Sequence, residues 1–193
     1  MTDHGEEDIK VRLRERQGTG ARYDSPAAPA RELLWARRGT AYFARHLNAL
    51  SDSDLDAPSR VPGWSRRHVV AHVGYHARSL ARLVEAARNG VTQEKLAEPE
   101  NQIEDVEFGA TLPGHALRYL FLHSEVHLNV EWRDLHEAGW NTSVRTLDSD
   151  IVPIRNTPWL RAREIWLRTL DLDNGGTSAD FPQGFVLMLE SAI

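Results

Sequence analysis

Three histidines, His68, His72 and His76, recur at four-residue intervals in the segment PGWSRRHVVAHVGYHA. Residues four apart lie on the same side of an α-helix, so this spacing brings imidazole rings together in pairs. Two such histidines can supply two ligands of a zinc ion, with a third ligand coming from another helix. Histidines on a half-apolar helix face can equally be hydrogen-bonded packing residues. The spacing alone leaves both interpretations open.

The apolar stripe of the same helix indicates which of these rings can reach the interior. The stripe runs from Val69 to Leu80 with helical period. His76 falls inside the stripe and His72 lies at its edge, so both can face the interior of a helical bundle. His68 lies further round, close to the start of the helix, and is expected to be a structural residue nearer to solvent.

A glutamate and an arginine are also spaced four residues apart, Glu164 and Arg168 in the segment TPWLRAREIWLRTLDL. If both are exposed, they form a local ion pair worth about 0.3–0.5 kcal/mol. The helical phase of Glu164 relative to Leu160 and Leu167 indicates partial burial instead. A carboxylate in that position needs a cation, which either Arg168 or a metal ion could supply.

Another histidine pair at this spacing, His123 and His127, stands in the segment HSEVH. Its glutamate is at the wrong offset for the H-E-x-x-H zinc motif. Both histidines fall on the flank of their helix, so we expect them to be solvated surface residues.

Apolar residues of helical period predict the elements that position these groups. Four long helices are predicted, near residues 31–50, 64–89, 113–138 and 157–172. Thr157 is expected to cap the last one, with Pro158 at its first position. We expect a polar loop over about 91–111, a short hairpin in NTSVRTLDSDIVPIRN and the start of a fifth helix in FPQGFVLMLESAI. The predicted fold is an all-α four-helix bundle, preceded by a flexible N-terminal arm over residues 1–30.

The composition argues against several classes of function. The chain of 193 residues has a net charge of -5 and a pI near 6.0, which gives no support to a nucleic-acid partner. It has no cysteine, so the protein itself supplies neither disulfides nor a thiolate. No apolar run approaches the roughly 20 residues that a membrane span needs. The charged N-terminus does not resemble a secretory signal, so we expect a cytoplasmic protein with no membrane partner.

Two segments, VPGWSRRHVVAHVGYHARSLARLVEAA and TPWLRAREIWLRTLDL, resemble the mycothiol-dependent maleylpyruvate isomerase family. The resemblance extends through EFGATLPGHALRYL and EWRDLHEAGW, and it covers roughly residues 30–190. It implies that residues 31–193 form the DinB-like four-helix bundle of the family's N-terminal lobe. Family isomerases continue into a C-terminal lobe that helps to form the substrate cleft. Because the chain stops at Ile193, we expect that lobe to be absent.

The resemblance also implies a divalent metal, usually zinc, inside the bundle. Its ligands would be His72, Glu164 and a histidine four residues after that glutamate. This chain has Arg168 at the third position, and a guanidinium cannot ligate zinc. His76, one turn from His72, is the candidate replacement ligand. Since Arg168 can pair with Glu164 in the space of the metal, we expect zinc affinity to be weak or absent.

The family's chemistry gives such a site a clear purpose. A zinc ion with three protein ligands keeps one position open, where the thiol of the cosubstrate mycothiol would be deprotonated. The thiolate can add to the double bond of maleylpyruvate, allow rotation and leave, which gives fumarylpyruvate. The resemblance therefore implies a small-molecule substrate and a low-molecular-weight thiol as partners. The alternatives are a non-catalytic or metal-free bundle and a mycothiol S-transferase of other specificity.

Overall fold

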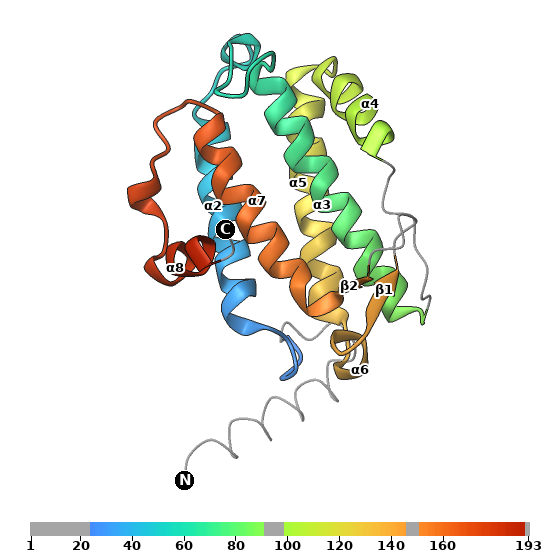
Figure 1. Ribbon diagram of the computed structural model, residues 1–193. Helices are drawn as coiled ribbons and strands as arrows, with labels where there is room; N and C mark the ends of the chain where they lie inside the picture. Colours follow the sequence, from blue (N-terminus) through green and yellow to red (C-terminus); the bar gives the residue numbers. More distant parts are fainter. Residues whose placement is uncertain (1–23, 91–98, 146–150, 192–193) are drawn as a thin grey trace, which may run out of the picture.

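The computed structural model describes residues 24–90, 99–145 and 151–191. Four long helices lie side by side (Figure 1): α2 (Ala30–Asn48), α3 (Arg66–Arg88), α5 (Gly114–Asp134) and α7 (Thr157–Asp171). Three shorter helices accompany them: α4 (Pro99–Ala110), α6 (Glu137–Trp140) and α8 (Gln183–Ser191). Single 3-10 turns cover Asp54–Asp56, Ile154–Asn156 and Ser178–Asp180. The predicted all-α class and four-helix bundle are confirmed.

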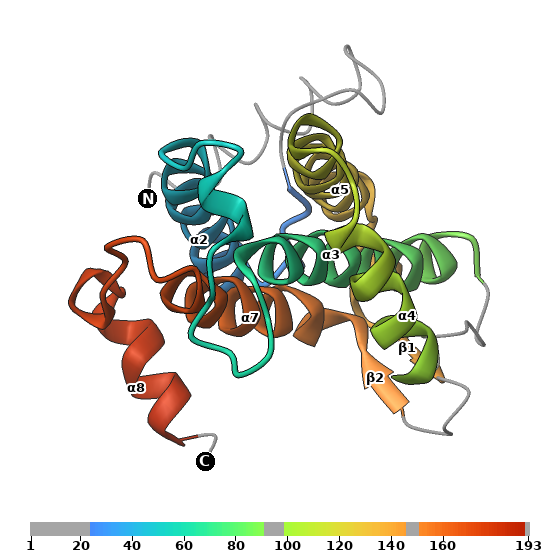
Figure 2. The same ribbon diagram turned by 90° about the horizontal axis from the view of Figure 1, so that it is seen from above.

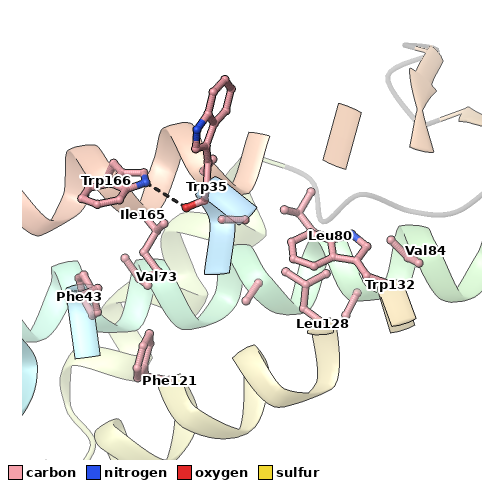
Figure 3. Close-up of a cluster of buried hydrophobic side chains, with 14 of the residues drawn as sticks. Trp35, Phe43, Val73, Leu80, Val84, Phe121, Leu128, Trp132, Ile165 and Trp166 are labelled. Atoms are coloured by element: carbon pink, nitrogen blue, oxygen red, sulfur yellow. Dashed lines mark hydrogen bonds between the residues drawn. The ribbon is translucent and has the colours of Figure 1, made fainter. Parts of the chain in front are cut away.

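Helix α3 is the centre of the bundle. It packs against α5, α4 and α7, while α2 packs against α7 (Figure 2). Apolar side chains from all four long helices meet in one core, part of which is drawn in Figure 3. The indole N–H of Trp166 donates to the backbone oxygen of Trp35 at 3.0 Å, so a buried polar group between α7 and α2 is satisfied.

Gly39 permits the close approach of α2 to α7. A Cβ atom at this position would lie 2.6 Å from Cγ2 of Ile165 and 2.9 Å from Nε1 of Trp166. Any side chain at position 39 would therefore push α7 away from α2 or force both neighbours to move.

The short hairpin predicted before the last long helix is present. Strand β1 (Ser143–Arg145) pairs antiparallel with β2 (Ile151–Pro153), with Val144 opposite Val152. The fifth helix is also confirmed as α8, whose buried Phe185 contacts the ring of Trp35 at 6.0 Å between centroids. Within the described residues, no helix has the length and apolarity required to cross a membrane.

The expected polar loop over 91–111 is wrong in its second half, where α4 forms; residues 91–98 lie outside the described residues. Val106 and Ala110 of this helix are buried, while Ile103 and Phe108 are 65% and 63% exposed. The helix offers only a narrow apolar edge to the core, so its sequence carries no broad stripe.

Three details at the ends of elements also differ from expectation. Helix α5 ends at Asp134 rather than near 138, because Leu135 is extended before α6 begins. Thr157 does not cap α7: its hydroxyl donates to the oxygen of Ile154 at 2.8 Å and accepts from the indole of Trp132 at 3.0 Å. The predicted arm falls mainly on residues 1–23, outside the described residues, whereas Asp24 forms an ion pair with Arg37 of α2.

Candidate functional site

His68 stands at the start of α3 and fixes that end of the helix. Its Nδ1 lies 2.8 Å from Oγ of Ser65 and accepts from the backbone N–H of Ser65 at 3.1 Å. These contacts form a capping box, in which the first residues of the helix satisfy each other's polar groups. The prediction that His68 is a structural residue near the helix start is confirmed.

His72 reaches from α3 to Glu164 of α7, so the two residues come together as predicted. Nε2 of His72 lies 2.6 Å from Oε1 of Glu164, and Nε of Arg168 donates to the same oxygen at 2.6 Å. Nη1 of Arg168 also donates to Asp171 at 2.6 Å. Both side chains of the Glu164–Arg168 pair are partly buried, with 22% and 28% exposed.

The protonation state of Glu164 is set by two opposing effects. Burial raises the pKa of its carboxyl group, but the hydrogen bond from His72 and the nearby His76 and Arg168 outweigh burial and hold that pKa well below its usual range. The carboxylate is therefore charged and can only accept hydrogen bonds. Nε2 of His72 must then carry the proton of the His72–Glu164 bond.

His76 is engaged differently, although it is only one turn further along α3. Its Nδ1 lies 3.1 Å from Nη1 of Arg161, which also donates to the backbone oxygen of Val73 at 3.0 Å. The side chain of Arg161 is completely buried and forms an ion pair with Glu125 of α5. Thr40 of α2 donates to the other carboxylate oxygen of Glu125 at 3.0 Å. Burial and the Arg161 charge lower the pKa of His76 to about 3.

A cavity of about 210 Å³ lies next to both histidines. Its walls come from α3, α4, β2 and α7, and they are formed by His72, Tyr75, His76, Ser79, Leu80, Leu83, Val106, Val152 and Leu160. Most of this lining is apolar, and its polar groups are the imidazoles of His72 and His76 and the hydroxyls of Tyr75 and Ser79. The cavity can therefore hold a small molecule in contact with the site.

Comparison with known proteins identifies the family. Residues 36–173 match the family described as the mycothiol maleylpyruvate isomerase N-terminal domain. The chain belongs to this family. A crystal structure of a mycothiol-dependent maleylpyruvate isomerase is similar to it, with 34% identity and a TM-score of 0.80, over 84% of this chain and 68% of the other. A histidine-to-alanine mutant of such an isomerase matches at 33% identity with the same TM-score and coverage. No curated protein matches the chain.

The side chains of this family member do not fit the three-ligand zinc site that the family resemblance implies. His72 and Glu164 are together, but the guanidinium of Arg168 occupies the place of the third ligand and binds Glu164 directly. His76 directs Nδ1 at Arg161, and its ring centroid is 6.4 Å from that of His72. In the described parts of the chain, no group of three or more His, Cys, Asp or Glu side chains could hold a metal ion.

The other histidine pair lies away from the site. His123 is exposed, and Nε2 of His127 lies 3.5 Å from Oε1 of Glu131 on the same helix. These are surface residues, as the sequence predicted.

Sequence reasoning missed the buried pair of Arg161 and Glu125. Glu125 falls in the same apolar stripe of α5 as Phe121 and Leu128, and Arg161 falls on the face of α7 that buries Ile165. An acid and a base that both stand at core-facing positions predict a buried ion pair. That signal was available in the sequence.

Proposed function

We propose that this chain catalyses the addition of mycothiol to an activated double bond of a small molecule, with the His72–Glu164 pair rather than a metal ion as the activating group. Family membership and two similar structures of mycothiol-dependent isomerases support the thiol as cosubstrate. The observation that carries the proposal is the 2.6 Å contact between Nε2 of His72 and Glu164 at the edge of the cavity.

The donor and acceptor roles of this pair support general-base chemistry. Because Nε2 of His72 gives its hydrogen to Glu164, the neutral form of the ring has its lone pair on Nδ1. Nδ1 has no hydrogen-bond partner among the described residues, so it is available to accept the proton of the mycothiol thiol. Glu164 stabilises the imidazolium that results, since its carboxylate is already ionised.

The reaction then proceeds without a change of oxidation state. The thiolate sulfur forms a bond to one carbon of the double bond, and the π electrons move to the conjugated carbonyl oxygen as an enolate. Rotation about the new single bond follows. The enolate electrons return, the carbon–sulfur bond breaks, and the departing thiolate takes back the proton from His72. The product is the trans isomer, with the thiol regenerated.

For maleylpyruvate itself we expect little or no turnover, well below the enzyme median of ~10 s⁻¹. Arg168 places a permanent positive charge where the family resemblance puts a metal ligand. The strongest activation of the thiol, by a bound metal ion, is therefore not expected. The cavity is also mostly apolar, whereas maleylpyruvate carries two carboxylates.

That apolar lining favours a second candidate function, mycothiol S-transfer to a more apolar electrophile. In this reaction the thiol adduct is the product, because the enolate is protonated before the thiol leaves. The activating pair and the cavity would be the same. Analysis of the products for a stable thioether distinguishes transfer from isomerisation.

The decisive experiment is an assay of maleylpyruvate and of a series of more apolar enones, with and without mycothiol, in zinc or in a chelator. We expect slow thiol-dependent turnover that the chelator does not reduce. His72→Gln should reduce it by about 10²–10⁴-fold, the usual contribution of a general base. His123→Gln, on the exposed flank of α5, is the matched control and should leave the rate unchanged.

Two results would contradict the proposal. Turnover that appears only with zinc would assign the chemistry to a metal. Rates that are the same with and without mycothiol, for every substrate, would identify the chain as a non-catalytic bundle.

A further inference from the structure

The guanidinium of Arg161 lies inside the bundle and connects two of its faces. It contacts His76 on the cavity side and Glu125, which Thr40 also binds, on the side of α2 and α5. A completely buried arginine is costly unless it is paired, and here Glu125 supplies the opposite charge. The contact with His76 is a hydrogen bond in addition to that ion pair with Glu125.

The direction of the Arg161–His76 hydrogen bond is fixed by chemistry. A guanidinium has only donors, so Nη1 of Arg161 donates and Nδ1 of His76 accepts at 3.1 Å. A ring whose Nδ1 accepts and which is neutral carries its single proton on Nε2. Burial and the adjacent guanidinium both act against a second proton on His76.

The remaining nitrogen of His76, Nε2, is left to bind a ligand. His76 is one of the residues that line the cavity, and the contact of Nδ1 with Arg161 is the only hydrogen bond of its ring within the described part of the chain. His72, the other imidazole of the lining, already gives its Nε2 hydrogen to Glu164. In their neutral forms the two histidines therefore offer different groups: a lone pair on Nδ1 of His72 and an N–H on Nε2 of His76.

We propose that Arg161 is a positioning residue that holds His76 as an Nε2–H donor, and that the cavity binds a small molecule with an apolar body and a single carboxylate or enolate oxygen against this donor. That such a molecule is the substrate rests on the proposed function, whereas its binding does not. In the proposed reaction, the donor would stabilise the enolate oxygen that forms after thiol addition.

The rest of the cavity wall determines how many charges the ligand carries. None of the described residues that line the cavity is a lysine or an arginine. Five of them, Leu80, Leu83, Val106, Val152 and Leu160, are apolar. A second carboxylate would lose its water here without a cation in return, which is unfavourable. The cavity thus selects a monoacid over a diacid.

Binding of 3-phenylpropanoate and of maleate, measured by calorimetry without mycothiol, tests the selectivity. We expect 3-phenylpropanoate to bind at least about tenfold more tightly than maleate. Its end opposite the carboxylate is apolar, whereas maleate carries a second carboxylate there. His76→Leu should lose about tenfold or more of this affinity, because the charge-assisted hydrogen bond disappears, whereas His76→Gln should retain most of it. His123→Leu is the control for a histidine outside the cavity.

The role of Arg161 is tested by nitrogen NMR of protein with ¹⁵N-labelled histidine. The wild type should show His76 with its proton on Nε2 only. Arg161→Met combined with Glu125→Gln removes both buried charges together, which protects the fold, and should leave His76 in a mixture of tautomers with weakened 3-phenylpropanoate binding.

A His76 proton on Nδ1 in the wild type, tighter binding of maleate, or full affinity in His76→Leu would each overturn the proposal. Failure of the thiol assay alone would leave it standing, because none of these measurements involves turnover.

Discussion

The two histidine–arginine centres of the bundle use the same residue types in opposite ways. In the open centre, His72, Glu164 and Arg168, the histidine and the arginine both donate to one carboxylate. In the buried centre, His76, Arg161 and Glu125, the histidine accepts from the arginine and the carboxylate lies on the far side. Both histidines come from α3 and both arginines from α7. A histidine's role is therefore set by which partner its ring meets, not by its spacing in the helix.

Burial makes the two centres unequal in energy. The side chains of Arg161 and Glu125 are 0% and 9% exposed, whereas those of Arg168 and Glu164 are 28% and 22% exposed. Water screens the open centre and can replace a lost partner, but it cannot reach Arg161. The same substitution should accordingly have very different costs in the two places.

The largest expected effect is the loss of the arginine in the buried centre. Arg161→Met leaves Glu125 as an uncompensated buried charge, so the free energy of unfolding should fall by about 3–5 kcal/mol. Urea denaturation at neutral pH measures the change. Arg163→Met, on the exposed face of the same helix, should stay within about 0.5 kcal/mol of the wild type. Equal losses in the free energy of unfolding for the two variants would mean that the buried ion pair contributes no more to stability than an exposed arginine.

The next effect is on zinc affinity at the open centre. Arg168→His replaces a permanent cation with a neutral nitrogen donor beside His72 and Glu164, so zinc affinity at neutral pH should rise by at least about tenfold. Titration calorimetry of the wild type and the variant provides the comparison. Adding His76→Ala to Arg168→His should not reduce the affinity, because His76 faces Arg161. Equal, tight binding by wild type and variant would instead identify His76 as the working third ligand.

The smallest expected effect is the loss of the arginine in the open centre. Arg168→Gln removes ion pairs with Glu164 and Asp171, but His72 still donates to Glu164. Partly exposed pairs of this kind contribute about 0.2–1 kcal/mol, so urea denaturation should show a loss in that range. A loss as large as that of Arg161→Met would remove the distinction between the two centres.

The sequence was sufficient to predict the long helices because each carries a broad apolar stripe. Helix α3 was expected over 64–89 and spans Arg66–Arg88, and the last long helix was expected over 157–172 and spans Thr157–Asp171. Helix α4 could not be predicted in this way. Among its described residues 103–110, Val106 and Ala110 are the only buried hydrophobic residues. A stripe that narrow has no detectable period.

The candidate site was predicted in part. The meeting of His72 and Glu164 followed from the family resemblance and from helical phase, and the contact of 2.6 Å confirms it. The partner of His76 did not follow, since the choice between Arg161 and a shared metal depends on the distance between α3 and α7. Distances between helices depend on details that periodicity does not report, such as the close contact of Gly39 of α2 with Ile165 of α7.

The central position of α3 has a consequence for the order in which the bundle opens. Helices that pack on several neighbours exchange their amide hydrogens only with global unfolding, whereas edge helices with few buried side chains exchange through local opening. We expect α3 to be among the slowest segments in hydrogen–deuterium exchange and α4, through its residues 103–110, to be among the fastest. If exchange follows this order, the cavity wall at Val106 would open more often than the α3 wall that carries both imidazoles.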